Sequence, residues 1–338
     1  MEAIKVGLVA DPALPAEIAE HMTDLSPSRG DDRPWDVEVV GESFTTGSED
    51  VDVAFTRLTD CARDHDWELV VGLTELPLRD DDGRYLLVGG DPQGQRAVLS
   101  LPALGGFRVR TRTRKALHDL LSGMATSKTA DGHRVRLSRL GGRWRLLSGM
   151  VIANRPWLLV PGLKSALVAA LATGAISTIN STVWLLASSL SWWRLAVATF
   201  ASIALVVGWL IVDGHLWDHP DDDSASARER SRLYNASTLI TLTAGGLICY
   251  VALYLVNLAW ALFVLDPGVM GGYLHASIHY GDLFLLSWFV ASAATVGGGL
   301  GSGLESNETV RSAVYSQREQ DRRDHIARSR RQSRRAEK

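Results

Sequence analysis

Cysteine is scarce in this sequence, with two residues among 338. Cys61 lies in an acidic region and Cys249 in the middle of an apolar stretch, so their thiols are expected in different phases and cannot easily pair. This excludes a disulfide framework, a C-x-x-C redox pair and a cysteine zinc knuckle. The first 25 residues also lack the uninterrupted apolar core of a secretory signal peptide, so we expect the N-terminus to remain in the cytoplasm.

Charge is almost missing from four apolar stretches, which lie at about residues 163–186, 195–212, 237–263 and 283–303. Each is about as long as the ~20 residues that a helix needs to cross a bilayer. Lys164 is the only full charge inside them, and it lies at an edge from which its side chain can reach the headgroups. The sequence therefore predicts an all-α transmembrane region of four helices within residues 162–304. The lack of a mid-span charge argues against a proton-coupled pump.

Positive charge is concentrated in the segments that flank and join these stretches. Residues 126–160 carry 7 basic and 1 acidic side chains, and residues 305–338 carry 10 basic and 6 acidic side chains. Of the 21 basic residues in all the flanking and joining segments, 20 are cytoplasmic if both termini are inside. We therefore predict a multi-pass protein of the cell membrane with both termini in the cytoplasm.

The basic linker at 126–161 interleaves arginines with aromatic and aliphatic residues. This pattern predicts contact with anionic lipid headgroups, at roughly 1 kcal/mol for each basic side chain. The alternative is a solvated flank that only sets orientation. The basic tail at 305–338 is expected to contact the same lipids and no nucleic acid, because it lacks a folded scaffold. The linker arginines are Arg134, Arg136, Arg139, Arg143, Arg145 and Arg155.

Residues 1–125 alternate short aliphatic runs with amphipathic segments. Strands are expected at 4–10, 35–40, 67–73, 85–88 and 97–101, and helices at 15–25, 51–62 and 108–124. This order predicts one cytoplasmic α/β domain. Residues 1–100 carry 22 acidic and 8 basic side chains, a net charge of −14, so the domain could recognise a basic protein partner.

The α/β domain resembles the archaemetzincin branch of the zinc metalloproteases, through about residues 4–122. After the opening strand and helix, the similar segments are W-E-L-V-V-G-L-T-E-L-P-L at 67–78, R-A-V-L-S-L-P-A-L at 96–104 and K-A-L-H-D-L-L-S at 115–122. In that family the last segment is a helix with H-E-x-x-H, whose histidines bind zinc and whose glutamate is the general base.

The corresponding segment here keeps one histidine, His118, while Asp119 replaces the glutamate and Ser122 the second histidine. A single imidazole cannot supply the three protein ligands of a catalytic zinc. The resemblance therefore implies a degenerate metzincin-like fold with no cofactor. His118 and Asp119 are the weak catalytic candidates, and the alternative for His118 is a partly buried helix residue without a ligand role.

A second candidate metal site is His275-x-x-x-His279-x-x-Asp282, before the fourth apolar stretch. On a helix, the i, i+4, i+7 spacing would place both imidazoles and the carboxylate on one face. The alternative is that these residues cap and solvate the start of a membrane helix.

Two segments near the apolar stretches resemble actinobacterial four-span membrane proteins that have no known activity. They are G-M-V-I-A-N-R-P-W at 149–157 and R-E-R-S-R-L-Y-N-A-S-T at 228–238. Small residues also recur every four positions at Ala166, Ala170 and Gly174, and at 297–303, which allows close helix contact and homo-oligomers. The sequence thus favours a membrane protein whose α/β domain is a non-catalytic interaction or regulatory module. The alternatives are a membrane-tethered hydrolase with an altered metal site, and an oligomeric channel or transporter.

Overall fold

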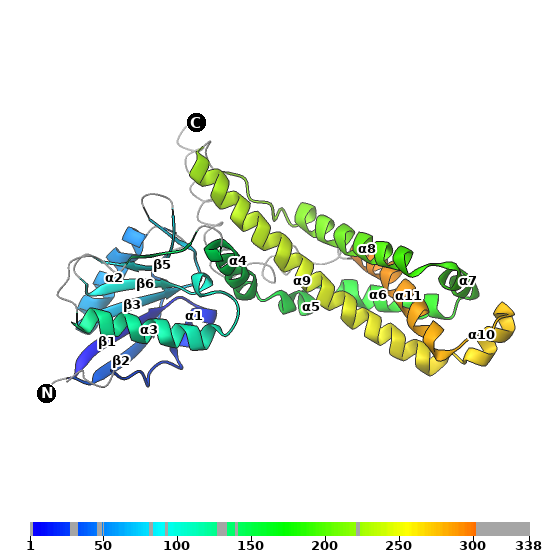
Figure 1. Cartoon of the computed structure of the whole chain (residues 1–338), viewed down its shortest axis with the longest axis horizontal. Coiled ribbons are helices and arrows are strands. Elements are labelled where there is room, and N and C mark those ends of the chain that lie inside the picture. The colour runs from blue at the N-terminus through cyan, green and yellow to red at the C-terminus, as the bar shows by residue number, and fades with distance from the viewer. Residues whose placement is uncertain are drawn as a thin grey trace. The chain divides into compact units, whose positions relative to one another are not determined.

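The computed structural model describes residues 3–27, 33–45, 49, 51–80, 84–91, 94–126, 134–138, 141–220 and 224–301 (Figure 1). The chain forms two compact units, one built mainly on residues up to Asn154 and the other mainly on those from Arg155 onward. The first is an α/β unit and the second is helical, which confirms the predicted division into these two classes. The predicted basic tail at 305–338 lies outside the described residues, as does Arg139.

The described residues of the α/β unit contain a seven-stranded sheet with the order β2-β1-β3-β6-β5-β4, and β7 pairs with β5. The first four strands in this order are parallel, while β5 is antiparallel to β6, β4 and β7. The strands are β1 (Ile4–Ala10), β2 (Trp35–Gly41), β3 (Leu69–Thr74), β4 (Leu78–Arg79), β5 (Tyr85–Gly90), β6 (Arg96–Ser100) and β7 (Val135–Arg136). The central strands read as continuous apolar runs because both faces of the sheet are covered.

Three helices cover the sheet, and they are α1 (Leu14–Ala19), α2 (Val51–His65) and α3 (Val109–Thr126) (Figure 1). The sheet has one hydrophobic core on each face, and alternate residues of β1 point into different cores. Val6 and Leu8 pack with the apolar faces of α1 and α3, whereas Val9 packs with α2. The α2 core also contains Phe44 and Trp67, two of its largest side chains.

A fourth helix, α4 (Gly141–Ala153), belongs to the α/β unit and packs on the 3-10 turn η1 (Pro102–Leu104). The contact is close because Gly149 has no side chain where the helix meets the backbone of Pro102. Arg145 Nε donates to the carbonyl oxygen of Ala103 at 2.7 Å. The compact unit therefore continues past the boundary predicted at residue 125, and residues 141–153 are a packed helix rather than a solvated linker.

The helical unit contains one 3-10 turn and several long helices. Its elements are η2 (Pro156–Leu158), α5 (Leu159–Gly162), α6 (Lys164–Thr178), α7 (Ser181–Ser189), α8 (Trp192–Asp213), α9 (Ala225–Val264), α10 (Pro267–Leu274) and α11 (Tyr280–Gly301). Among the described residues, three helices are long and apolar enough to cross a membrane, at Trp192–Asp213, Ala227–Val264 and Tyr280–Gly298. The number of candidate spans rises to four only if the bent helix pair Gly141–Gly162 and Lys164–Thr178 forms a single span.

The first predicted transmembrane helix, residues 163–186, is not one helix. It breaks between α6 and α7 at Ile179 and Asn180, and the 15 residues of α6 are about 22 Å long against a hydrocarbon core of about 30 Å. The Asn180 side chain caps the new helix by accepting from Thr182 N at 2.9 Å. The Trp184 indole donates to the carbonyl oxygen of Thr178 at 2.7 Å, so the break leaves this buried backbone group satisfied.

Small residues bring α6 close to α11 and to α9 within one chain. A side chain at Gly298 would meet the Ala166 carbonyl and the Ala170 methyl at 2.8 Å, and one at Gly174 would overlap the Asn257 amide. Ala166 and Ala170 are buried. The face that the sequence suggested for homo-oligomers is therefore used for packing between helices of the same chain, as small residues in membrane helices allow.

Candidate functional site

His118 lies on α3, one helical turn before Ser122. Its ring centroid is 5.9 Å from that of Trp35, at a tilt of 53°, and its Nδ1 is 3.8 Å from Asp119 Oδ1. Trp35 begins β2, so His118 packs at the amino end of that strand. Among the described residues, no group of three or more His, Cys, Asp or Glu side chains is arranged to hold a metal ion.

The second candidate, His275 with His279 and Asp282, does not form the predicted helical face. His275 ends α10 in the left-handed conformation with φ 53°, and α11 begins only at Tyr280. Asp282 Oδ2 accepts from His279 N at 2.8 Å, so the carboxylate caps the first turn of α11. The prediction of three ligands on one helix is therefore wrong, and the capping alternative describes these residues.

The linker arginines separate into different roles. Arg136 Nε lies 2.9 Å from the buried Asp80 carboxylate, and Arg145 holds η1 as described above. Arg134 and Arg143 are exposed, and Arg155 begins η2 with φ 50°. Trp144, beside Arg143 on α4, is 71% exposed, which leaves an indole and a guanidinium together on the surface.

A group of buried polar residues at the carboxyl edge of the parallel strands was not predicted. Its members lie at or after the carboxyl ends of β1, β2, β3 and β6, and they are Asp11, Thr45, Thr74, Glu75 and Ser100. The chain leaves β1 toward β2 on one side, and β3 lies on the other side, so the topological switch point is between β1 and β3. The available signal was a polar residue directly at the end of the apolar runs of β1, β3 and β6, whereas Thr45 lies four residues beyond β2.

The hydrogen bonds of this edge tie the loops together. Asp11 accepts from Phe44 N at 3.4 Å and from the Thr45 hydroxyl at 3.3 Å. Glu75 Oε1 accepts from Leu14 N at 3.1 Å, and the Ser100 hydroxyl donates to the Leu76 carbonyl at 2.8 Å. The edge thus places two buried carboxyl groups on neighbouring strands at the point where open α/β sheets bind ligands.

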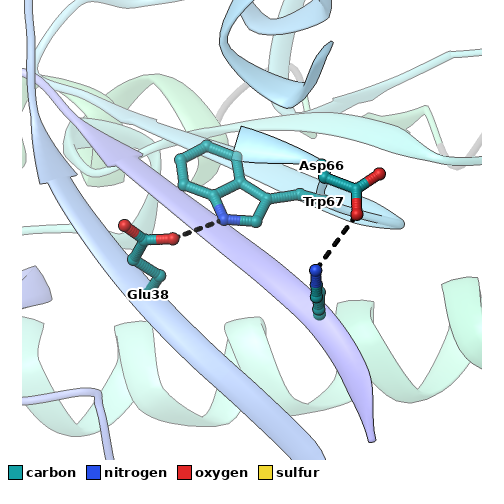
Figure 2. Close-up of polar contacts among 4 residues, drawn as sticks. Glu38, Asp66 and Trp67 are labelled. Carbon is teal, nitrogen blue, oxygen red and sulfur yellow. Dashed lines mark hydrogen bonds and ion pairs between the residues drawn. The ribbon is translucent and has the colours of Figure 1, made fainter. Parts of the chain in front are cut away.

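Another polar cluster lies at the opposite, amino edge of the sheet (Figure 2). Trp67 Nε1 donates to Glu38 Oε2 at 2.8 Å, and the His65 ring stacks on the Trp67 ring with centroids 4.5 Å apart. Asp66 pairs with Lys5 at 3.0 Å. These contacts fix the large indole over β1, and we assign them a structural role.

The helical unit has its own hydrogen-bond network, which joins α8, α9 and α11. The Tyr250 hydroxyl lies 3.0 Å from Thr199 Oγ1 and 2.9 Å from Ser292 Oγ, and Trp288 Nε1 donates to Thr199 Oγ1 at 2.7 Å. Polar side chains inside an apolar bundle are stable when they satisfy one another in this way. The network satisfies the hydrogen-bonding groups of these four side chains within the helical unit.

Cys61 is the cysteine outside the apolar helices. Burial raises the pKa of its thiol, and the nearby Glu42 carboxylate, with Oε2 3.9 Å from Sγ, raises it further. The thiolate is the reactive form, so Cys61 is expected to react slowly at neutral pH.

Comparisons of this chain with protein-family models, with curated proteins and with solved structures found no match.

Proposed function

We propose that this chain is a multi-pass membrane protein that carries a non-catalytic α/β binding unit on the cytoplasmic side. The observation that carries the proposal is the packing of His118 on Trp35. In the metalloprotease family that residues 4–122 resemble, a histidine at this place binds zinc. Here the imidazole serves an aromatic contact, and the next helical turn offers Ser122 in place of a second histidine.

The proposed partner is a basic protein segment. Residues 1–100 carry a net charge of −14, and Asp11 and Glu75 place two carboxyl groups at the carboxyl edge of the sheet. Lipid contact by the exposed Arg143 and Trp144 would hold the unit near anionic headgroups. Binding of the basic segment and contact with anionic headgroups are both expected to weaken as the salt concentration rises, because both depend on charge.

Orientation follows from the distribution of basic residues. The join between α8 and α9 contains Arg228, Arg230 and Arg232 at the start of α9, whereas residues 265–279 between α9 and α11 contain neither lysine nor arginine. The positive-inside rule therefore places the α8–α9 join in the cytoplasm and α10 outside. The α/β unit shares the cytoplasm only if the chain crosses the membrane once more before α8.

Cysteine labelling in intact cells tests this orientation. In a background of Cys61→Ala and Cys249→Ala, we expect Gly272→Cys on α10 to react with a membrane-impermeant maleimide. Ser224→Cys before α9 and Asp119→Cys on α3 are expected to react only after permeabilisation. Labelling of Asp119→Cys in intact cells would instead show a three-span protein with the α/β unit outside, and labelling of Ser224→Cys would invert the whole arrangement.

Zinc content tests the non-catalytic role. We expect the purified protein to hold no stoichiometric zinc, and His118→Ala to lower the stability of the α/β unit by only about 1 kcal/mol, the usual size of an aromatic contact. Metal is measured by elemental analysis after dialysis against a weak chelator, with Ser122→Ala as the matched control on the same helix. Tight zinc that is lost in His118→Ala and kept in Ser122→Ala would overturn the proposal in favour of a metalloenzyme.

A further inference from the structure

The helical unit contains a groove between α6, α8, α9 and α11. Its walls include Leu163 and Ala170 from the α6 side, Ile203 from α8, Gly246 and Leu253 from α9, and Gly298 from α11. The walls are almost entirely hydrocarbon, and the groove is open on one side. The helices α8, α9 and α11 that form it are the three that are apolar and long enough to cross a membrane.

The polar side chains that reach the groove have their hydroxyl groups engaged elsewhere. The Tyr250 hydroxyl is bonded to Thr199 and Ser292, and the Thr295 hydroxyl donates to the Ala291 carbonyl of its own helix at 2.7 Å. The Tyr250 ring and the Thr295 methyl group are therefore the surfaces that a bound molecule would contact. A polar ligand would therefore lose its hydrogen bonds to water on entry without gaining partners, which is costly.

Glycine makes the room in the groove. A methyl group at Gly246 would fit in ordinary van der Waals contact with Ile203 and Val207, both 3.8 Å away, so the glycine leaves about the space of one methyl group unfilled between α8 and α9. At Gly298, in contrast, α11 is in tight contact with α6. The groove is thus bounded by a tight contact between α6 and α11 and has residues of α8 and α9 along its other walls, so that an occupant would contact four helices.

We propose that this groove holds one acyl chain of a membrane lipid. The inference rests on the membrane location in the proposed function, because that location makes hydrocarbon chains the surrounding solvent. An apolar chain matches the walls, and because the bilayer is itself hydrocarbon, what favours the groove over bulk lipid is van der Waals packing against the helices. A chain held between four helices differs from the general lipid shell in that it is retained when the shell is replaced by detergent.

Native mass spectrometry of the full-length protein in mild detergent tests the groove. We expect the wild type to retain about one phospholipid per chain. Gly246→Trp should reduce the retained fraction at least tenfold, or about 1.4 kcal/mol. Gly208→Trp on α8 is the matched control, because nothing lies within 4 Å of a side chain at Gly208. Val206→Trp fills the groove from α8 and gives a second variant if Gly246→Trp does not fold. Tyr250→Phe should keep the lipid, since the hydroxyl does not face it.

Cys249 lines the groove and provides an independent readout. With Cys61→Ala, we expect Cys249 to react slowly with a small apolar maleimide and faster after exhaustive delipidation, whereas in Gly246→Trp delipidation should change nothing. Equal lipid retention in the wild type and both groove variants, loss of lipid in Tyr250→Phe, or Cys249 cross-links between two chains would each overturn the acyl-chain proposal. Failure of the protein to fractionate with membranes would instead overturn the proposed function itself.

Discussion

Replacement of Gly7 by alanine is expected to destabilise the α/β unit by about 3 kcal/mol, at the upper end of the usual cost of overpacking. A methyl group at Gly7 in β1 would overlap the six-membered ring of Trp67. The ring cannot move aside at low cost, because Glu38 accepts a hydrogen bond from its N–H (Figure 2) and the His65 ring stacks on it. We therefore expect the full destabilisation of about 3 kcal/mol.

Urea unfolding of residues 1–154, followed by tryptophan fluorescence, measures this effect. The control is Gly41→Ala on the neighbouring strand β2, where nothing lies within 4 Å of the added methyl group. We expect that variant to stay within about 0.5 kcal/mol of the wild type. Similar unfolding midpoints for Gly7→Ala and Gly41→Ala would show that Trp67 does not occupy the place described here.

Replacement of Gly149 by alanine is expected to release α4 from the α/β unit at a cost of about 3 kcal/mol. The added methyl group would overlap the backbone of Pro102 in η1, and backbone cannot rotate away as a side chain can. Separation of α4 from η1 also removes the bond from Arg145 to Ala103 and exposes Leu146 and Met150, which are buried now.

Hydrogen exchange across α4, together with urea unfolding of residues 1–154, checks this expectation. Gly141→Ala at the start of the same helix is the control, because its nearest neighbour, Ser138 Oγ, is 3.5 Å away. Alanine is the better helix former, so Gly141→Ala should be neutral or slightly stabilising. Unchanged exchange in α4 of Gly149→Ala would contradict the assignment of α4 to the α/β unit.

Local pattern was sufficient for most elements of the α/β unit. The strand predicted at 4–10 is β1 at Ile4–Ala10, and the helices predicted at 51–62 and 108–124 are α2 and α3 with slightly different ends. The helix predicted at 15–25 ends at Ala19, because the chain beyond it turns and Met22 and Leu25 are buried from loop positions. Apolar spacing identifies buried residues, and they need not be helical.

The sequence pattern did not predict the break in the first apolar stretch or the packing of α4 on the α/β unit. The apolar length of residues 163–186 resembles that of a continuous membrane helix, yet Asn180 and Trp184 supply the hydrogen bonds that allow a break. Residues 141–153, in which Arg143 and Arg145 flank Trp144, resemble a membrane flank, yet Gly149 and Arg145 pack on η1. The break depends on side-chain hydrogen bonds that replace the regular backbone bonds of a helix. The packing of α4 depends on η1, which is distant in the sequence.

The sequence by itself determined the class of each unit, because apolar periodicity and the length of uncharged stretches report burial and membrane compatibility directly. Only the tertiary structure decided which residues meet. It packs His118 on Trp35, separates His275 from the helix of Asp282, brings Asp11 and Glu75 to one sheet edge and places Gly246 in the wall of the groove. Side-chain chemistry at a site depends on contacts between segments far apart in the chain, and residue spacing within one segment does not encode those contacts.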